Sequence, residues 1–428
     1  MLVGASPRPV AIVGGARIPF ARGSGAYAQA GNQEMLIAAL RGVVERFGLR
    51  GQRIDDVAAG AVMKHSSQWN LTRESVLGCG LAAETPGLDL QRACGTSLEA
   101  AISLANKIAL GQIDCAIAAG VDTVSDPPVV YPKSFQQILL RSYRGRTASA
   151  RVLPWFGLRP KSFRPVLPGV TEPRTGLSMG ESTELMVKTW GITRAEQDQL
   201  ALESHQKAAA AYAQGFYQDL VIEYLGLSQD NNIRADTTME KLAKLRPAFN
   251  SSGAGTLTAG NSTPMTDGAS AVLLASETWA RERNLPVLAY LRYGKVAAVD
   301  YIEKKEGLLM APAYAVSRML ADANLTLQDF DFYEIHEAFA GQVLCTLKAW
   351  TDPGYCRDKL RLPGALGGID RSKLNVKGGS IAIGHPFAAT GARIVATLAK
   401  VLDENKAKRG LISVCTAGGM GVTAILER

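Results

Sequence analysis

The sequence predicts an α/β fold in which helices cover both faces of a parallel or mixed sheet. Two observations lead to this prediction. Apolar, strand-like runs alternate with helical spacings from Pro9 to Asp122, and a similar order of elements returns after Ser270. With 428 residues the chain is also too long for one ordinary hydrophobic core, so we expect two or three domains.

The first half begins with an apolar run at 9–15 that ends in glycines and predicts a buried strand. Helical spacing follows at 32–47 and ends at Gly48, a residue that commonly terminates helices. The remaining predicted elements are strands at 57–63 and 113–119 and helices at 73–81 and 95–110. The helix at 95–110 is rich in small residues.

The second half repeats this plan with less regular spacing. Its predicted strands lie at 271–275, 287–293, 330–334 and 411–414, and its predicted helices at 311–323, 338–350 and 388–405. The two halves are most alike around Cys94 and His385, because each of these residues precedes a small-residue helix that is followed by a strand. We interpret this as a weak internal duplication.

A segment of different composition separates the halves. It is rich in proline, arginine and polar residues at first and strongly helical from 180 to 217. Structureless connections of this length are uncommon in compact domains, so the segment should be a lid over the site. We therefore expect an N-terminal half at 1–125 that is completed by 247–279, an inserted lid or loop domain at 126–246, and a C-terminal half at 280–428.

The composition is that of a globular protein, with 47% hydrophobic and 20% charged residues. No stretch approaches 18 uninterrupted apolar residues, the length that a membrane-spanning helix needs. The six cysteines form no C-x-x-C pair and have no histidine at ligand spacing, which argues against a structural metal site or a disulfide framework. We expect a cytoplasmic protein with reduced thiols and no bound metal.

The net charge of +8 comes from one segment. Residues 131–164 contain eight basic and no acidic residues, which leaves 39 basic against 39 acidic residues elsewhere. Large apolar residues alternate with these arginines. Three interpretations compete: an amphipathic element for a membrane surface or a partner protein, a rim that attracts phosphate near a coenzyme, and a solvated lid face. Nucleic-acid binding has no recognition motif in its favour.

Four residues are candidates for chemistry. Cys94 lies just before a predicted helix, where the helix dipole and free N–H groups favour a thiolate, although a buried structural cysteine is the alternative. His385 lies between Gly384 and Pro386, in a turn held tightly enough to aim one side chain toward Cys94 as its base. A satisfied structural histidine is the alternative there.

The other two candidates lie at predicted strand ends. His336 follows a strand and precedes a helix, so its ring could donate a hydrogen bond to a developing oxyanion. Cys415 ends a strand and runs into a turn with three glycines, where exposed N–H groups can line an anion site. A second thiol at this position could move a proton to or from carbon.

These residues lie within motifs that resemble those of the thiolase family over essentially the whole chain. The matching motifs are Cys94 with its helix, His336-Glu337-Ala338-Phe339, Asn375 to Gly379 with Gly384-His385-Pro386, Cys415 with its glycines, Lys244 to Phe249, and Thr258 to Asn261 with Asp267-Gly268-Ala269. The resemblance implies a duplicated five-layer αβαβα fold with an inserted, mainly helical lid.

The resemblance also implies a role for each reactive residue. Cys94 matches the nucleophile that becomes acylated, and His385 matches the base that activates it. Cys415 matches the acid and base that acts on the α-carbon of acetyl-CoA. His336, through a water, and His385 match the oxyanion hole for the thioester enolate. The backbone N–H groups of Cys94 and Ala417 match a second oxyanion hole.

Three further residues match substrate contacts of the family. Met179 matches a residue that lines the acyl pocket, and Arg234 and Thr263 fall where the family contacts coenzyme A. The activity implied is acetyl-CoA C-acyltransferase, the thiolytic cleavage of 3-ketoacyl-CoA by CoA in fatty acid β-oxidation, with no metal or redox cofactor. The alternatives are condensation of short acyl-CoA units by an acetyl-CoA acetyltransferase, and an inactive acyl-CoA-binding scaffold subunit.

Finer features resemble the β subunits of trifunctional enzymes. They include His336 where some members carry asparagine, the sequence from Asp230 to Arg234, and the absence of a Ser-x-Ala-Pro-His loop. This resemblance implies longer 3-ketoacyl chains, a homodimer or higher oligomer, and partnership with a hydratase/dehydrogenase α subunit. It also favours peripheral membrane contact through 131–164 over a merely solvated face.

Overall fold

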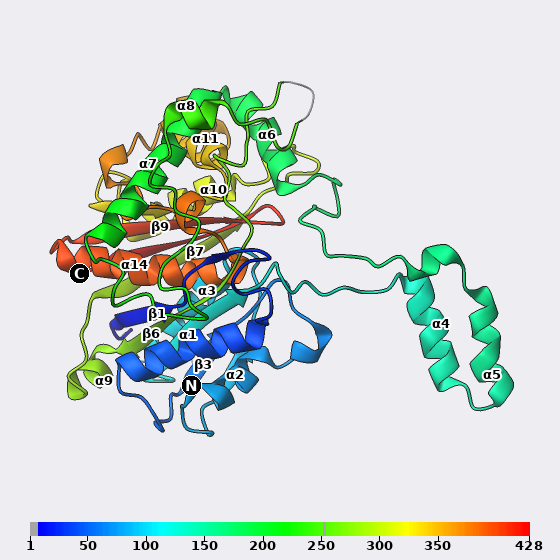
Figure 1. Cartoon of the computed structure of the whole chain (residues 1–428). Helices are drawn as coiled ribbons and strands as arrows, with labels where there is room; N and C mark the ends of the chain where they lie inside the picture. The colour runs from blue at the N-terminus through cyan, green and yellow to red at the C-terminus, as the bar shows by residue number, and fades with distance from the viewer. Residues whose placement is uncertain (1–6, 251–253) are drawn as a thin grey trace.

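The computed structural model of the chain describes residues 7–250 and 254–428. It is a mixed α/β structure whose two halves each contain a twisted sheet (Figure 1). Residues 1–6, which belong to the expected N-terminal half, lie outside the described part. The α/β prediction is confirmed.

The N-terminal sheet has the strand order β4-β3-β5-β6-β1. Strand β3 runs parallel to β4 and β5, whereas β6 is antiparallel to both β5 and β1. Its strands are β1 (Val10–Arg17), β3 (Asp56–Ala59), β4 (Gly87–Asp89), β5 (Cys115–Asp122) and β6 (Thr266–Ser276), and the short β2 (Ala21–Arg22) pairs with β6. The burial of β1, β5 and β6 along their whole length explains their apolar sequences.

The C-terminal sheet has the order β7-β10-β9-β8. Its strands are β7 (Ala289–Ala298), β8 (Phe332–Ile335), β9 (Arg409–Thr416) and β10 (Met420–Glu427). A short antiparallel pairing joins the two sheets, because Ala11 and Ile12 of β1 pair with Tyr290 and Ala289 of β7. The strand ladder is therefore continuous from β4 to β8.

Helices cover the outer faces of both sheets and fill the space between them (Figure 1). The outer layers are formed by α1 (Asn32–Arg46) and α2 (Leu71–Cys79) on the N-terminal half and by α10 (Ala311–Ala323) and α11 (Ala340–Thr351) on the C-terminal half. The middle layer consists of α3 (Thr96–Ala109) and α14 (Thr390–Glu404), which contact both sheets. This is the five-layer αβαβα arrangement that the resemblance implies.

The two middle helices pack closely near their N-terminal ends. A Cβ atom added to Gly391 of α14 would overlap the backbone nitrogen of Leu98 in α3, and the N–H of Ala392 donates a 2.8 Å hydrogen bond to the Ser97 hydroxyl. Cys94 precedes α3 and His385 precedes α14. This backbone contact therefore brings the two residues together.

The differences from the sequence prediction include a divided helix and an additional strand. The helix expected over 180–217 is divided at Gly191, whose φ of 59° ends α6 (Met179–Trp190) before α7 (Arg194–Ala213) begins. The glycine turn after Cys415 is followed by another strand, β10, which the sequence analysis missed. Gly418 and Gly419 adopt φ values of 75° and 69°, which only glycine tolerates easily, and so form the hairpin between β9 and β10.

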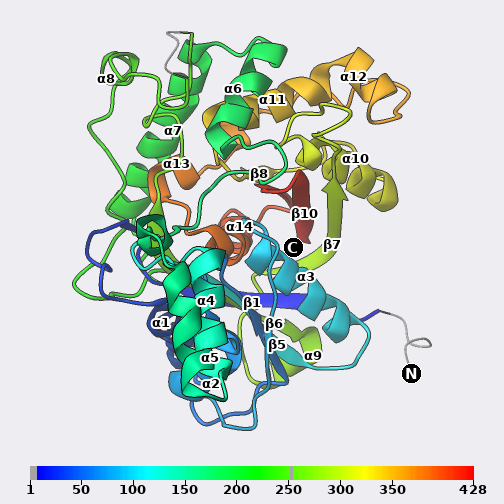
Figure 2. The same cartoon turned by 90° about the vertical axis from the view of Figure 1, so that its right-hand side faces the viewer.

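The segment expected to form one lid has two separate parts. Helices α6 and α7 pack against α11 of the C-terminal half. In contrast, the other part is a hairpin that projects away from both sheets (Figures 1 and 2). It consists of α4 (Lys133–Arg144), α5 (Ala148–Val152) and two short 3-10 turns, η2 (Leu153–Gly157) and η3 (Pro160–Phe163). Residues 133–163 therefore do not lie over either sheet, and a lid remains a prediction for the rest of the segment.

Short helices complete the described structure. They are α8 (Met239–Ala243), α9 (Glu277–Glu282), α12 (Pro353–Asp358) and α13 (Ser380–Ile383), together with the 3-10 turns η1 (Ser66–Gln68), η4 (Arg371–Lys373) and η5 (Phe387–Ala389). None of the helices in residues 7–250 and 254–428 has both the length and the apolar composition that a membrane crossing requires.

Candidate active site

The structure gathers three of the four candidate residues at one point. A ligand atom from each of Cys94, His336 and His385 lies within 4.8 Å of the others, and the two imidazole rings are 4.1 Å apart between centroids. These residues come from the turns before α3, after β8 and before α14. Cys415 lies near the end of β9. It is close enough to Cys94 for the Cys94 thiol to raise the pKa of the Cys415 thiol.

The turn that presents Cys94 is held in a strained conformation. Ala93 has a φ of 43°, which is uncommon for a residue with a side chain. The Thr96 hydroxyl stabilises this turn, because it accepts a hydrogen bond from the Arg92 N–H at 2.9 Å and donates one to the Ala93 carbonyl at 2.7 Å. The chain thus reverses sharply at the thiol.

The pKa of the Cys94 thiol is raised to about 12, chiefly because burial disfavours the thiolate. A backbone hydrogen bond from Ala417 opposes this shift, and the charge of Asp122 adds to it. The expectation that the helix terminus would favour a thiolate is therefore wrong for the resting site. Cys94 remains partly accessible to solvent, as a nucleophile must be, but desolvation of its thiol outweighs the helix dipole.

His385 is held in one orientation by two hydroxyl groups. Its backbone N–H donates to Thr266 Oγ1 at 2.8 Å, and its Nδ1 lies 2.6 Å from Thr390 Oγ1. Burial and the charge of Arg393 lower the pKa of His385 to about 3. Its Nε2 is buried without a partner in the described residues. With Nδ1–H donated to Thr390, Nε2 carries a lone pair that can accept the Cys94 proton.

His336 presents the opposite tautomer to the site. Arg393 can only donate, and its Nη2 donates to Ser380 Oγ at 3.0 Å. Among the described contacts of that hydroxyl, only His336 Nδ1, at 2.8 Å, can accept its proton. His336 must therefore carry its own proton on Nε2, which is buried and unpartnered among described residues. Burial, His385 and Arg393 lower the pKa of His336 well below its usual value, so the ring is a neutral donor.

Cys415 is protonated in the resting site. Burial raises the pKa of its thiol well above the usual value, and the neighbouring Cys94 adds to the shift. Its Sγ lies 3.4 Å from the side-chain oxygen of Gln342 on α11. A protonated thiol aimed by an amide can give a proton to a carbanion and take one back later.

Sequence patterns do not predict the residues that orient these groups: Ser380, Thr390, Arg393 and Gln342. Each one acts through a contact across 5 to 73 positions of sequence, which no local pattern reveals. The only signal in the sequence that could have indicated them is their position next to the predicted motifs. Ser380 directly follows Gly378-Gly379, and Thr390 lies one turn after His385.

Arg234 and Thr263 line one cavity beside the reactive groups. Its volume is about 570 Å³, and the basic side chains of Arg22, Arg234 and Lys241 lie in its wall. The Thr263 hydroxyl donates a 2.9 Å hydrogen bond to the carbonyl of Ser380, next to the His336 orienting pair. Met179 does not line this cavity and instead packs, half-buried, against the apolar cluster that contains Cys415.

The sulfur and the two nitrogens at the centre are also a donor set that Zn²⁺ accepts. In the described residues, the backbone N–H groups of Cys94 and Ala417 hydrogen-bond the Cys94 sulfur, and the Cys415 thiol is close enough to interact with it. N–H groups cannot coordinate a cation. The arrangement therefore suits a developing anion better than a metal ion.

An αβαβα fold that gathers two thiols and two neutral imidazoles fits an enzyme that transfers acyl groups. Residues 10–278 match the N-terminal domain of thiolase, and residues 285–428 match its C-terminal domain. The chain belongs to the thiolase family.

Individual relatives agree with this assignment. The chain is 41% identical to the 3-ketoacyl-CoA thiolase of Yersinia enterocolitica, over 98% of this chain and 96% of that protein. Among solved structures, the acetyl-CoA acetyltransferase of Bacillus anthracis matches with a TM-score of 0.82 at 30% identity, over 99% of this chain and 100% of that one. Human mitochondrial 3-ketoacyl-CoA thiolase matches with a TM-score of 0.81 at 28% identity, over 99% of both chains.

The pKa shifts predict how the free enzyme reacts with iodoacetamide. Because the pKa of Cys94 is about 12, its thiolate fraction should rise about tenfold per pH unit between pH 6 and 9. His385, with a pKa of about 3, stays neutral over this range and adds no inflection. The alkylation rate of Cys94, followed by peptide mass spectrometry, should therefore climb without a plateau. A plateau below pH 8 would show a stable thiolate and imidazolium pair instead.

Proposed function

We propose that the protein is a 3-ketoacyl-CoA thiolase that cleaves its substrate with CoA to give acetyl-CoA and an acyl-CoA shortened by two carbons. The observation that carries this proposal is the gathering of two buried, unpartnered imidazole Nε2 atoms beside Cys94, whose thiol interacts with that of Cys415. The hydrogen bonds described above assign a lone pair to one Nε2 and a proton to the other. Two thiolase halves would surround this site. The first would consist of residues 1–125 with 247–279, and the second of residues 280–428.

The first half-reaction would begin with proton transfer from Cys94 to Nε2 of His385. The thiolate then attacks the 3-keto carbon, and the N–H groups of Cys94 and Ala417 receive the oxyanion. When the bond between C2 and C3 breaks, its electron pair forms the enolate of acetyl-CoA. Nε2–H of His336 and of protonated His385 can stabilise this enolate, and Cys415 protonates C2. The products are acetyl-CoA and acyl-Cys94.

The second half-reaction would transfer the acyl group to CoA. The Cys415 thiolate left by the first step takes the proton from the thiol of CoA, which attacks the acyl carbonyl. The same two N–H groups receive the oxyanion. Cys94 leaves as a thiol after His385 returns its proton, so every group regains its starting state. In this scheme Arg234 and Thr263 would contact the coenzyme, whose phosphates suit the basic wall of their cavity.

Replacing Cys94 tests the proposed function. Cys94→Ala should abolish thiolysis, measured by loss of the 3-ketoacyl-CoA absorbance, and should remove the acyl adduct seen by intact-protein mass spectrometry. Cys79→Ala, which changes a buried thiol on α2, is the matched control and should keep both. Turnover by Cys94→Ala would refute the nucleophile. Bound acyl-CoA without any acyl-enzyme in the wild type would favour the inactive scaffold subunit instead.

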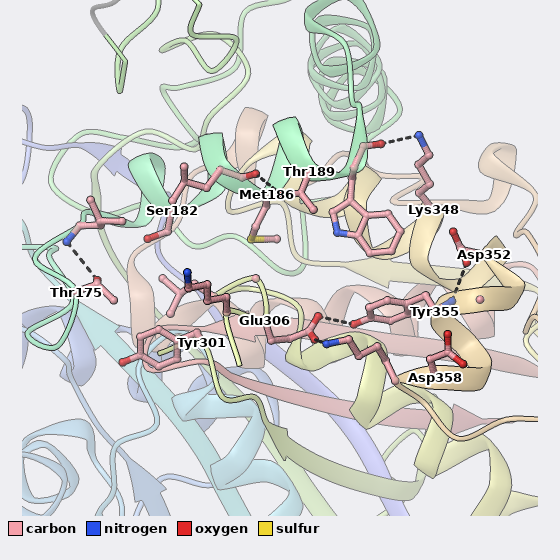
Figure 3. Close-up of a pocket in the computed structure, with 18 residues that line it drawn as sticks. Thr175, Ser182, Met186, Thr189, Tyr301, Glu306, Lys348, Asp352, Tyr355 and Asp358 are labelled. Atoms are coloured by element: carbon pink, nitrogen blue, oxygen red, sulfur yellow. Dashed lines mark hydrogen bonds and ion pairs between the residues drawn. The ribbon is translucent and has the colours of Figure 1, made fainter. Parts of the chain in front are cut away.

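A second cavity favours a substrate with a long acyl chain. It has a volume of about 740 Å³ and lies between α6, α12 and the loop after β7. In Figure 3, Met186 and Thr189 of α6 face Tyr301 and Tyr355 across it. The ring of Tyr301 also lies against Gly419, in the turn after Cys415. Tyr301 thus links the wall of this cavity to the turn that follows Cys415.

Most polar groups of this cavity are already paired with one another. Glu306 binds Lys359 at 3.0 Å and the Tyr355 hydroxyl at 2.9 Å, and Lys348 donates to the Trp190 carbonyl at 2.6 Å. The surfaces left for a ligand are mainly apolar: Leu177, Leu185, Met186, Trp190 and Leu308. Met179 lies seven positions before Met186 on the same face of α6, so the cavity would extend the acyl pocket proposed for Met179.

Filling this cavity should shorten the preferred substrate. Thr189→Trp should lower kcat/KM for 3-ketohexadecanoyl-CoA at least about tenfold, because each methylene that loses burial costs roughly fourfold in binding. It should leave acetoacetyl-CoA within about twofold. Lys188→Trp, on the neighbouring exposed position outside the cavity, is the matched control. Equal losses for both substrates would place the acyl chain elsewhere and leave the condensing, short-chain alternative open.

We further propose that the projecting hairpin docks on an anionic membrane surface. All eight basic residues of 131–164 are exposed, and none of them forms an ion pair within the described structure. Phe135 anchors a small aromatic cluster with Tyr131, Trp155 and Phe163, which leaves other large apolar side chains in solvent. The most exposed of these are Tyr143 at 86% and Phe156 at 82%. Basic charge around exposed aromatic groups suits a headgroup region.

This hairpin is the feature that supports a β subunit of the trifunctional-enzyme type, acting at the cytoplasmic face of a membrane as a dimer or larger assembly. Wild-type protein should sediment with vesicles containing phosphatidylserine and should be released by salt, whereas Phe156→Ser with Tyr143→Ser should remain in solution. The double variant should retain thiolysis, because the hairpin projects away from both sheets. Light scattering gives the mass of both proteins.

Binding to neutral and anionic vesicles alike would contradict the electrostatic part of this proposal. No binding to either, with formation of a stable complex when a hydratase/dehydrogenase subunit is co-expressed, would assign the hairpin to a protein partner instead.

A further inference from the structure

The carboxylate of Glu172 reaches the turn that follows Cys415. Glu172 lies in the segment that returns from the hairpin to α6, and only 5% of its surface is exposed. Its Oε1 accepts a 2.6 Å hydrogen bond from the N–H of Gly418, and its Oε2 accepts one of 3.0 Å from the Tyr301 hydroxyl. A charged group buried beside a reactive centre, 246 positions away in sequence from its partner, calls for a physical explanation.

The turn that Glu172 contacts needs an external support. Ala417 gives the backbone hydrogen bond to Cys94, and the next two residues are glycines at positive φ. Successive glycines can exchange between several backbone conformations at little cost. A turn of this kind does not by itself fix the direction of the Ala417 N–H. A donor that stabilises an oxyanion must be fixed in advance, because reorienting it during the reaction cancels its benefit.

The carboxylate itself is held by a closed loop. The N–H of Glu172 donates to the carbonyl of Leu177 at 2.9 Å, and the N–H of Gly176 donates to the carbonyl of Glu172 at 2.8 Å. The loop ends where Ser178 caps α6. The side chain is therefore presented from a rigid base and not from a mobile connection.

We propose that Glu172 is a positioning residue, which holds the Ala417–Gly418 peptide and through it the backbone of Ala417, so that the Ala417 N–H receives the acyl oxyanion on Cys94. This inference rests on the proposed thiolase function. Glu172 does not touch the reacting atoms in this scheme. It acts through the Gly418 N–H, and the Tyr301 hydroxyl holds its second oxygen.

Two substitutions separate positioning from charge. Glu172→Ala leaves the Gly418 N–H without its acceptor and frees the turn, so kcat should fall about 100-fold, in the range found when an oxyanion donor is lost. Glu172→Gln keeps an oxygen that can accept the same hydrogen bond, and kcat should stay within about fivefold of the wild type. The KM for CoA should change little in both variants, because Glu172 is not part of the cavity that contains Arg234 and Thr263.

Alkylation supplies the readout that general damage to the fold would not reproduce. Iodoacetamide attacks Cys94 without forming an oxyanion, so its rate in Glu172→Ala should stay within about threefold of the wild type. Formation of acyl-Cys94 from 3-ketoacyl-CoA, measured by rapid quench and mass spectrometry, should fall with kcat. Glu303→Ala, an exposed glutamate in the Tyr301 loop, is the matched control and should keep wild-type values in both assays.

Three results would overturn the proposal: a kcat for Glu172→Ala within about threefold of the wild type, equal losses in alkylation and acylation, or a Glu172→Gln variant as impaired as Glu172→Ala. The last result would show that the negative charge of Glu172, and not its hydrogen bond to Gly418, is needed for turnover. Glu172→Gln also remains informative if Glu172→Ala does not fold. A wild-type protein that never forms acyl-Cys94 would refute the thiolase function itself. Normal acylation of both the wild type and Glu172→Ala would refute only the positioning role.

Discussion

The close contact between α3 and α14 is the constraint on which the rest of the site depends. Cys94 and His385 belong to different halves of the chain, and they meet only because Gly391 lets the backbones of these helices touch. The Asp122 carboxyl strengthens the same junction, since it accepts hydrogen bonds from the N–H groups of Met63 and Ala388. Both halves therefore contribute to one reactive centre, and neither has one alone.

Burial sets the protonation of that centre. The thiols of Cys94 and Cys415 keep their protons because a desolvated thiolate is unfavourable. The two imidazoles remain neutral because burial disfavours the imidazolium and the charge of Arg393 adds to that effect. A site without fixed charges on its reacting groups does not repel an anionic substrate. Charge would develop only when substrate supplies the carbonyl that receives it, which fits the placement of N–H donors rather than cations around the nucleophile.

Much of this could be predicted from the sequence, and the exceptions have a common origin. Cys94, His336 and His385 could be found because strand ends, glycines and helix starts lie next to them in the chain. The orientation of His336 through Arg393, and the contact of Glu172 with the last hairpin, depend on residues far apart in sequence. The thiol pKa was misjudged for the same reason. A helix terminus is visible in the sequence, whereas the desolvation that outweighs it arises only after packing.

The pairing of β1 with β7 has a mechanical consequence. Because the strand ladder runs unbroken from one half to the other, the halves lack the free linker on which a hinge motion between domains depends. A hinge opening between the two halves therefore cannot admit the substrate. Entry and release must use the segments outside the ladder, while the ladder itself holds the two halves in one arrangement.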